Sequence, residues 1–298
     1  MPPHGCNGFD AMSVDVEDWV NATILQETGR VCPPSDAVLM NSEKLLNLFE
    51  EHGASATWFF LGEIAEAFPG LVRKVAESGH EIGVHGFHHH QVPVMSRKAF
   101  REAVHRAKDA VEQAGGVPAL GYRAVDFGIN QKTWWALDVL TENGFKYDSS
   151  VFPMRTARYG MSGAPTEAHW IRTEDGARIY EIPVTVLKVL GFGVPFAGGG
   201  YFRMLPYWFT SVMMKWQHRR ASPAVFYLHP CEIEERSHLD GLPPNLNKDE
   251  KRQIRKRFVV ETRGRRRGTE KLGRLLNSYR FASIADVFHL DQLTIPSA

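Results

Sequence analysis

Two histidines at a short spacing are the clearest sign of chemistry in this chain. His85 and His89 lie four residues apart in the histidine-rich segment 79–90, just after a short apolar run that includes Ile82 and Val84. This spacing lets two imidazoles converge on one ion where the backbone turns, and imidazole binds zinc, cobalt, nickel and iron alike. A histidine cluster alone is also typical of a solvated loop. A metal site therefore requires a third ligand and a base from elsewhere in the chain.

Three acids follow the first apolar run, 11–16, and supply candidates for both roles. Asp15, Glu17 and Asp18 stand close together before Trp19. Adjacent carboxylates repel one another unless a cation, an arginine or a proton relieves them. A strand that ends in acids is typical of the functional end of a barrel strand, although an ordinary acidic loop has the same composition.

Reactive groups also follow two later apolar runs. Arg123 ends the run 119–123, and His229 comes directly after 224–228. Because the carboxyl ends of barrel strands meet at one mouth, we expect all of these side chains to converge. Two histidines and one carboxylate form an open catalytic metal site, with a second carboxylate left as a base, Arg123 to hold it ionised and His229 as an acid. This set can perform metal-assisted hydrolysis of an amide or an ester.

The elements that must position these groups alternate along the chain. Strands are predicted at 11–16, 56–61, 82–85, 119–123, 145–148, 179–184, 224–228 and 281–284. Helices are predicted from a cap at Asn41-Ser42 to Gly53, and at 64–68, 71–78, 100–114, 133–143, 207–218 and around 272–276. Residues 152–176 are predicted to form a long loop, the 152–176 excursion, over the open end of the barrel. Gly198-Gly199-Gly200 is predicted to form a turn. The alternation predicts an α/β fold, a deformed (β/α)7–8 barrel, in a single domain over residues 1–298.

The composition excludes several classes of protein. A net charge of +1 argues against a general polyanion binder, and the basic stretch 251–271 contains a single aromatic residue, Phe258, so no nucleic-acid partner is expected. That stretch leaves peripheral contact with an anionic membrane open. Three cysteines without CxxC spacing imply no disulfide framework. The absence of a signal-like start and of a membrane-length apolar run predicts a cytoplasmic protein without an integral membrane segment.

Together these motifs resemble a known family. The chain is similar to polysaccharide deacetylases of the NodB-homology type, carbohydrate esterase family 4. It most resembles the branch with an extended Asp-x-Glu-Asp-Trp motif, which includes exosortase-associated and allantoinase-like peptidoglycan deacetylases. The matching segments, in family order and spacing, are 13–19, 56–59, 79–89, 121–124, 144–150, 181–183, 198–203 and 227–230.

The resemblance implies roles for individual residues. It makes Asp15 the general base, Arg123 its partner, His229 the acid, and His85 and His89 ligands of a divalent metal, with zinc expected and cobalt, nickel or iron as alternatives.

The third ligand stays open between Glu17 and Asp18. Strand alternation puts Glu17 on the same side as Asp15. Asp18 keeps the ligand type usual in the family, but it requires the chain to have turned.

Two departures from the family pattern concern the substrate more than the reaction. Val125-Asp126 stands where a proline is common, and no clear motif tunes His229, for which Asp148 is a weak candidate. Several other residues have simple expectations. We expect His88 and His90 to be bystanders, Cys231 to be a pocket wall, Trp19 to be placed to stack on a sugar, and Arg203 to contact an anionic glycan or remain a surface charge.

The resulting hypothesis is a carbohydrate deacetylase that acts on the C–N bond of a linear amide. Its expected partner is an N-acetylated bacterial glycan, polysaccharide, or lipid- or nucleotide-linked sugar precursor. The alternatives are a non-catalytic glycan-binding barrel and an allantoinase-like hydrolase of a small cyclic amide. The sequence predicts neither the oligomeric state nor N- over O-deacetylation.

Overall fold

A nine-stranded sheet forms the centre of the molecule in a computed structural model that describes residues 8–156, 158–189, 191–233 and 242–292. Cys6 lies outside these residues. The strands are β1 Asp10–Val16, β2 Thr57–Phe60, β3 Glu81–Val84, β4 Gly121–Tyr122, β5 Tyr147–Asp148, β6 His169–Arg172, β7 Arg178–Glu181, β10 Val225–Leu228 and β11 Phe281–Ala282.

The sheet follows the order β10-β1-β2-β3-β4-β5-β7-β6, with β11 also paired to β1. All neighbours are parallel except β6, which runs antiparallel to β7. Within the described ranges β6 and β10 do not pair, so the sheet curls without closing. The predicted deformed α/β barrel is confirmed. Its parallel strands place their carboxyl ends at one end of the molecule.

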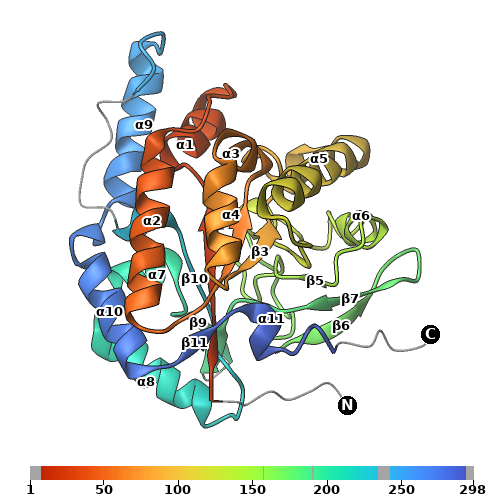
Figure 1. The fold of residues 1–298 in the computed structure, drawn as a ribbon, viewed down its shortest axis with the longest axis vertical. Helices are drawn as coiled ribbons and strands as arrows, with labels where there is room; N and C mark the ends of the chain where they lie inside the picture. Colours follow the sequence, from red (N-terminus) through yellow and green to blue (C-terminus); the bar gives the residue numbers. More distant parts are fainter. Residues whose placement is uncertain (1–7, 157, 190, 234–241, 293–298) are drawn as a thin grey trace.

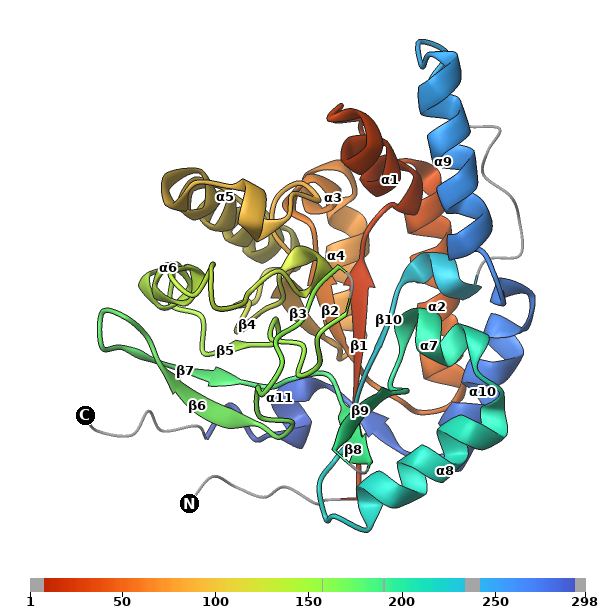
Figure 2. The ribbon, with the colours of Figure 1, turned by 180° about the vertical axis from the view of Figure 1, so that it is seen from behind.

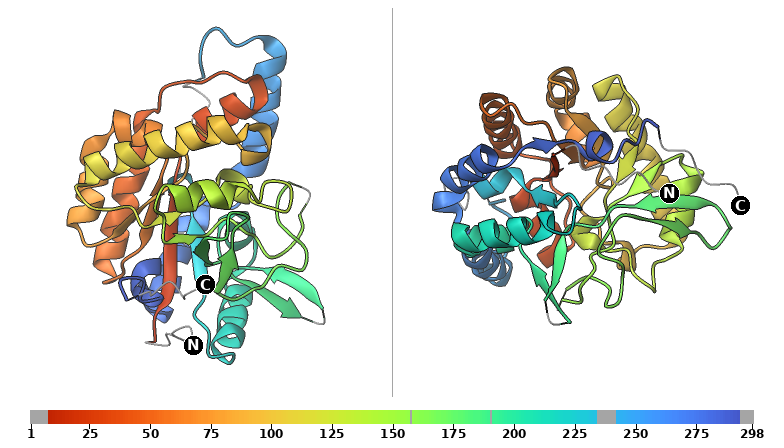
Figure 3. Two further views of the ribbon diagram at one scale, coloured as in Figure 1. Left: turned by 90° about the vertical axis from the view of Figure 1, so that its right-hand side faces the viewer. Right: turned by 90° about the horizontal axis from the view of Figure 1, so that it is seen from below.

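Helices cover the outside of the curled sheet (Figures 1 and 3). They are α1 Trp19–Thr28, α2 Asp36–Glu51, α3 Gly62–Ala67, α4 Pro69–Glu77, α5 Arg97–Gly115, α6 Ala136–Glu142, α7 Gly199–Met204, α8 Tyr207–His218, α9 Lys248–Glu261, α10 Gly268–Ser278 and α11 Ile284–Val287. Helices α1 and α9 stand side by side beyond the carboxyl end of β1 (Figures 1 and 2). No described helix is long and apolar enough to cross a bilayer.

Strand β1 shows how residue alternation sorts side chains between the two faces of the sheet. Met12, Val14 and Val16 belong to the large hydrophobic cluster that packs under the surrounding helices. Ala11 faces the opposite way, into a smaller cluster that contains Phe59 and Tyr147 and is closed by α11. Because side chains alternate along a strand, the odd-numbered residues of β1 lie on the inner face of the barrel. Asp15 therefore projects inward.

Glycines on the inner face make room for the rings that fill the barrel. A side chain added at Gly83 would place its Cβ 2.6 Å from the Phe59 ring. A Cβ at Gly121 would overlap the Tyr147 ring. The Phe59 ring in turn lies under the Arg123 guanidinium, 4.4 Å from its centre. The glycines of β3 and β4 thus make room for the Phe59 and Tyr147 rings, and the Phe59 ring supports the Arg123 guanidinium.

The structure corrects two expectations about helix boundaries. Helix α2 begins at Asp36 rather than at an Asn41-Ser42 cap, because both of those residues are buried against the core inside the helix. Within the glycine run, Gly198 caps an unexpected helix, α7, which begins at Gly199. Gly198 accepts a positive φ of 122° and packs against the backbone of Tyr227, where a Cβ would lie 2.7 Å from the Tyr227 nitrogen.

Several further elements were not predicted. Helix α1 follows the acid cluster directly, and a separate hairpin forms from β8 Val186–Val189 and β9 Phe192–Pro195. Strand β6 and helices α9 and α11 were not predicted either. Helix α1 buries much of its length and lacks a clear polar stripe, so its sequence offers little helical periodicity.

Candidate active site

Asp15 and Arg123 form a buried ion pair at the inner end of β1. Arg123 Nη1 donates to Asp15 Oδ1 at 2.7 Å and to Ser13 Oγ at 2.8 Å. Its remaining donors reach Ser149, with Nη2 at 2.9 Å from Oγ and Nε at 3.3 Å from the carbonyl oxygen. Arg123 is fully buried and Asp15 is 2% exposed. An arginine held by this many bonds fixes the orientation of the carboxylate.

Next to this pair, three side chains converge with the geometry of a metal site. Ligand atoms of Glu17, His85 and His89 all lie within 4.8 Å of one another. Glu17 Oε2 is 2.5 Å from His89 Nε2 and 3.8 Å from His85 Nε2. Within the described ranges this is the one such group of His, Cys, Asp and Glu side chains.

In both imidazoles, a polar group contacts Nδ1, the ring nitrogen that faces away from Glu17. His85 Nδ1 lies 2.8 Å from the carbonyl oxygen of Arg123, so Nδ1 donates and Nε2 is left as a lone pair facing Glu17. His89 Nδ1 lies 3.0 Å from the side-chain amide of Gln26. The amide nitrogen of Gln26 faces His89 Nδ1 and also donates to Asp126, so Nδ1 accepts and the proton of the neutral His89 ring lies on Nε2, toward Glu17. The contact at His85 is the one by which metal-bound histidines are usually held.

The electrostatics of the cluster also suit a cation. Burial alone would raise the pKa of the Glu17 carboxyl, but the nearby His89, His229 and His85 outweigh it and hold that pKa well below its usual range. Burial opposes a charge on His89, yet the Glu17 carboxylate raises the pKa of His89. The cluster therefore stabilises one positive charge beside Glu17. An open set of two imidazoles and a carboxylate fits a divalent transition metal.

Asp18, the other candidate ligand, is engaged elsewhere. Its Oδ1 accepts from the backbone N–H groups of Val20 at 3.0 Å and Asn21 at 3.3 Å, which caps α1. Its Oδ2 accepts from Ser35 N at 2.7 Å and Ser35 Oγ at 2.5 Å. The chain has turned at Asp18, but toward the start of α2 rather than toward the histidines. The geometry favours Glu17 as the third ligand.

His229 faces the cluster from β10, with its imidazole positioned by a residue that the sequence did not reveal. His229 Nε2 lies 3.5 Å from Glu17 Oε1, and its Nδ1 lies 3.0 Å from Glu232 Oε1. Burial opposes the charged imidazole, but Glu17 and Glu232 raise the pKa of His229 to about 10. Asp148, the weak candidate for this role, instead accepts a bond from Ser150 Oγ.

Glu232 is itself held in place. It lies on the 3₁₀ turn Pro230–Ile233, where a spacing of three residues returns its carboxylate to His229. Arg203 of α7 approaches Glu232 Oε1 at 3.4 Å and also donates to the carbonyl oxygen of Arg263 at 2.8 Å. Only 6% of the Arg203 side chain is exposed. Arg203 is therefore a buried cation with a structural role. Of the two roles expected from the sequence, a surface charge is wrong.

A cavity of about 510 Å³ opens above these groups. The lining includes the three candidate metal ligands Glu17, His85 and His89, together with Asp15 and His229. Its walls include Trp19, which packs edge-on against Phe258 of α9, and Cys231. Burial raises the pKa of the Cys231 thiol to about 12, so it is a neutral wall residue rather than a nucleophile. Aromatic rings beside polar groups suit the flat faces and hydroxyls of a sugar.

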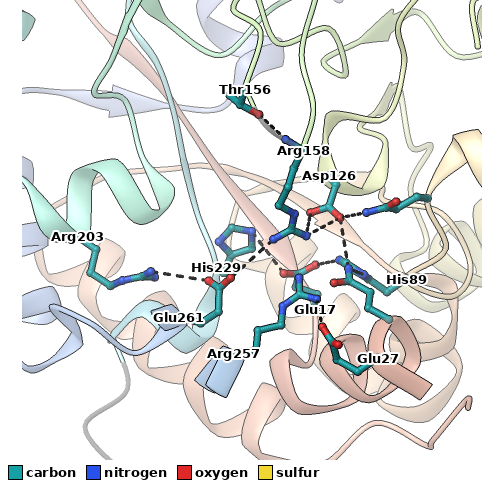
Figure 4. Close-up of polar contacts among 12 residues, drawn as sticks. Glu17, Glu27, His89, Asp126, Thr156, Arg158, Arg203, His229, Arg257 and Glu261 are labelled. Carbon is teal, nitrogen blue, oxygen red and sulfur yellow. Dashed lines mark hydrogen bonds and ion pairs between the residues drawn. The ribbon is translucent and has the colours of Figure 1, made fainter. Parts of the chain in front are cut away.

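Charged side chains from distant parts of the chain surround the cavity (Figure 4). Arg158 from the 152–176 excursion pairs with Asp126 at 3.0 Å and lies 3.8 Å from Glu261 of α9. Asp126 accepts from Gln26 at 3.3 Å, which connects this ion pair to His89. Asp126 and the next residue, Phe127, both adopt positive φ, near 50°, an uncommon conformation outside glycine. The departure of Val125-Asp126 from the family pattern was the available signal for this network.

The other histidines are not part of the cluster. His88 Nδ1 lies 2.5 Å from Glu63 Oε2, and His90 stacks edge-on against the His88 ring. Neither belongs to the group that could hold a metal, as expected for bystanders.

Comparisons with known proteins support the geometry. The model of a family described as polysaccharide deacetylase matches residues 36–147, and that of a domain of unknown function, DUF3473, matches residues 149–289. A peptidoglycan deacetylase of Helicobacter pylori is 29% identical over 113 residues, 36% of each chain. A peptidoglycan-N-acetylglucosamine deacetylase of Bacillus cereus is 32% identical over 118 residues, 36% of this chain and 43% of the relative. The matches thus span less than half the length of these curated relatives.

A solved structure resembles the whole fold. The crystal structure of a protein from Mycobacterium smegmatis, assigned as a polysaccharide deacetylase, superposes with a TM-score of 0.61. It covers 98% of this chain and 96% of its own, at 19% identity. At that identity the likeness describes the fold alone.

Proposed function

Because the chain carries a polysaccharide deacetylase domain of the NodB-homology, carbohydrate esterase family 4 type, we propose that it is a metal-dependent hydrolase that removes N-acetyl groups from a bacterial glycan or sugar precursor. The observation that carries the proposal is the convergence of Glu17, His85 and His89 beside the Asp15–Arg123 pair and His229. We further propose that residues 36–147 and 149–289 form one domain, because one sheet runs through both.

Glu17, His85 and His89 would hold the metal in this proposal. A divalent ion, zinc by its donor set with cobalt, nickel or iron as alternatives, would lower the pKa of a bound water and polarise the acetyl carbonyl. The bond at His85 Nδ1 already directs the Nε2 lone pair of that imidazole toward the site. His89 would give up the proton between its Nε2 and Glu17 when the ion binds.

Asp15 acts as the general base. Arg123 occupies its Oδ1, so the carboxylate stays ionised and its other oxygen can take a proton from the attacking water. The water oxygen forms a bond to the acetyl carbonyl carbon, and the proton remains on Asp15.

His229 acts as the general acid when the tetrahedral intermediate collapses. The C–N bond breaks, and the proton on Nε2 passes to the departing sugar nitrogen, which leaves acetate and a free amine. Glu232 holds the opposite nitrogen, Nδ1, and so keeps Nε2 directed at the cavity.

The substrate should present its acetamido group at the bottom of the cavity and its sugar ring between aromatic walls. The size of the cavity, about 510 Å³, suits one or two sugar rings. A cytoplasmic setting, and with it a lipid- or nucleotide-linked sugar, stays a prediction from the sequence.

Acetate release from a panel of N-acetylated sugars and chitooligosaccharides, with and without a chelator, tests the proposal. We expect release that the chelator stops and that added zinc restores. Asp15→Asn should remove most turnover while metal still binds. Acetate release that is indifferent to the chelator would refute the metal-dependent reaction. Failure of every substrate in the presence of bound metal would favour a non-catalytic glycan-binding barrel.

A further inference from the structure

Helix α8 presents an apolar stripe to solvent. Trp208, Val212 and Trp216 are 65%, 48% and 43% exposed, and they follow one another at four-residue steps. At 100° per residue, Lys215 and Arg219 fall on the same side of the helical axis. We call these five residues the α8 face. The opposite side of α8, including Thr210 and Met214, is fully buried, so the helix is firmly anchored to the fold.

The sequence segment that contains the α8 face has no acidic residues. The sequence contains neither Asp nor Glu between Glu181 and Glu232, although this stretch includes five Lys and Arg residues. Arg203 and Arg220 are engaged by carboxylates, the latter by Glu167 at 3.3 Å. In the described part of the chain no carboxylate lies within 4.0 Å of the charged groups of Lys215 or Arg219. The α8 face therefore combines exposed aromatic rings with cations that are left for an outside partner.

Helix α8 is joined to the rim of the cavity through the end of α7. Met204 is 55% exposed, lines the cavity at the end of α7, and is followed by Leu205-Pro206 and then α8. Val260 of α9, 65% exposed, lies on the same rim. In Figure 2, α7 and α8 follow each other on the near side of the molecule. Helix α8 runs from the end of α7 away from the cavity toward the amino end of β1, where His218 lies 2.9 Å from Asp10.

The chemistry of the α8 face selects among possible occupants. Tryptophan rings settle at the headgroup level of a bilayer, and a helix with aromatic and basic residues on its outer face is typical of interfacial binding. Contact with a second copy by a two-fold axis would bring Lys215 and Arg219 against the same cations of the partner, which repels. Charge complementarity instead favours an anionic lipid surface.

We propose that the α8 face docks on an anionic lipid bilayer. This goes beyond the proposed deacetylation and is independent of it. It also differs from contact through the basic stretch 251–271, where Arg257 is engaged by Glu27 and Ile254 is buried.

Vesicle cosedimentation of the full chain tests the proposal. We expect binding to vesicles of phosphatidylcholine with phosphatidylglycerol to exceed binding to phosphatidylcholine alone by at least about tenfold, and to weaken with salt. The double variants Trp208→Ser/Trp216→Ser and Lys215→Glu/Arg219→Glu should each lose most of this binding. Either variant carries the test if the other fails to fold.

Matched controls change exposed residues away from α8. Val94→Ser removes an apolar side chain that is 74% exposed, and Lys98→Glu reverses a cation whose side chain is 85% exposed; neither should alter binding. No vesicle binding by the wild-type chain would overturn the proposal. So would binding lost only in Lys251→Glu/Arg255→Glu, or a Trp208-dependent dimer in solution. Acetate release from a soluble sugar should persist in both α8 variants, which separates failure of docking from failure of catalysis.

Discussion

Replacing Asp18 and Glu17 one at a time separates the two tasks that the adjacent acids perform. In Asp18→Asn, the amide oxygen can serve only one of the two donor sets that the carboxylate now satisfies, the α1 N–H groups or Ser35. The amide nitrogen then faces the backbone N–H of the other set. In Glu17→Gln, the charged ligand beside His85 and His89 is lost while the helix cap is intact.

The cost of Asp18→Asn follows from these contacts. One buried N–H without a partner costs about 1–3 kcal/mol, and loss of the charge at the α1 N-terminus adds about 0.3–1 kcal/mol. We therefore expect the free energy of unfolding to fall by about 2–3 kcal/mol, with metal affinity nearly unchanged. Removing a partner that only supports a metal ligand costs about 10–100-fold in affinity, so loss of the ligand Glu17 should exceed about 100-fold.

Two measurements on the same pair of variants decide the matter. Urea denaturation in a chelator gives stability without metal, and competition with a chromophoric chelator gives zinc affinity. Asp18→Asn should change the first and Glu17→Gln the second. If Asp18→Asn loses the metal and Glu17→Gln keeps it, the assignment of the third ligand is reversed and the structural reasoning fails.

Three further changes test other parts of the site and the fold. Arg123→Met leaves Asp15 buried without its ion-pair partner and should lower the free energy of unfolding by about 3–5 kcal/mol. Adding Asp15→Asn should restore part of this loss. Urea denaturation of the two single variants and the double variant measures the coupling, and additive losses would contradict the pairing. Glu232→Gln should lower kcat about tenfold by loosening His229 while zinc affinity is unchanged, and an unaltered kcat would remove the positioning role. Burial lowers the pKa of His80 from 6.5 to about 4, so the unfolded chain takes up the proton first and stability should fall by about 3 kcal/mol as pH drops through this window. His80→Asn, which can still accept from Ala56 N, should flatten that decline, and a decline of unchanged slope would assign it to other groups.

The strands and helices that show a simple hydrophobic pattern could be predicted from the sequence. Buried parallel strands read as short apolar runs, so β1, β2 and β10 were found near their observed bounds. Their parallel order then predicts that groups at their carboxyl ends meet, as Asp15, Arg123 and His229 do. Alternation along the chain also predicts that Glu17 lies on the side of Asp15, and both residues line the same cavity.

Other features depend on packing that no short pattern encodes. Glu232 reaches His229 only because a 3₁₀ turn follows Pro230, and the spacing of three residues does not by itself distinguish such a turn from a loop. The contact of Arg158 with Asp126 joins segments 32 residues apart. Its geometry depends on a positive φ at Asp126, which the sequence marks only as an unusual substitution. Long-range polar contacts of this kind require the fold itself.

The three acids at the end of β1 would repel one another, and the fold relieves this repulsion in a different way for each acid. Adjacent carboxylates need separate sources of positive charge, and here each has its own. Arg123 pairs with Asp15, the imidazoles of the metal cluster surround Glu17, and the N-terminus of α1 binds Asp18. The third arrangement also serves the site, because the helix that Asp18 caps begins with Trp19, a wall of the cavity. Weakening this cap should therefore disturb the cavity wall at Trp19 before it disturbs metal binding by Glu17, His85 and His89.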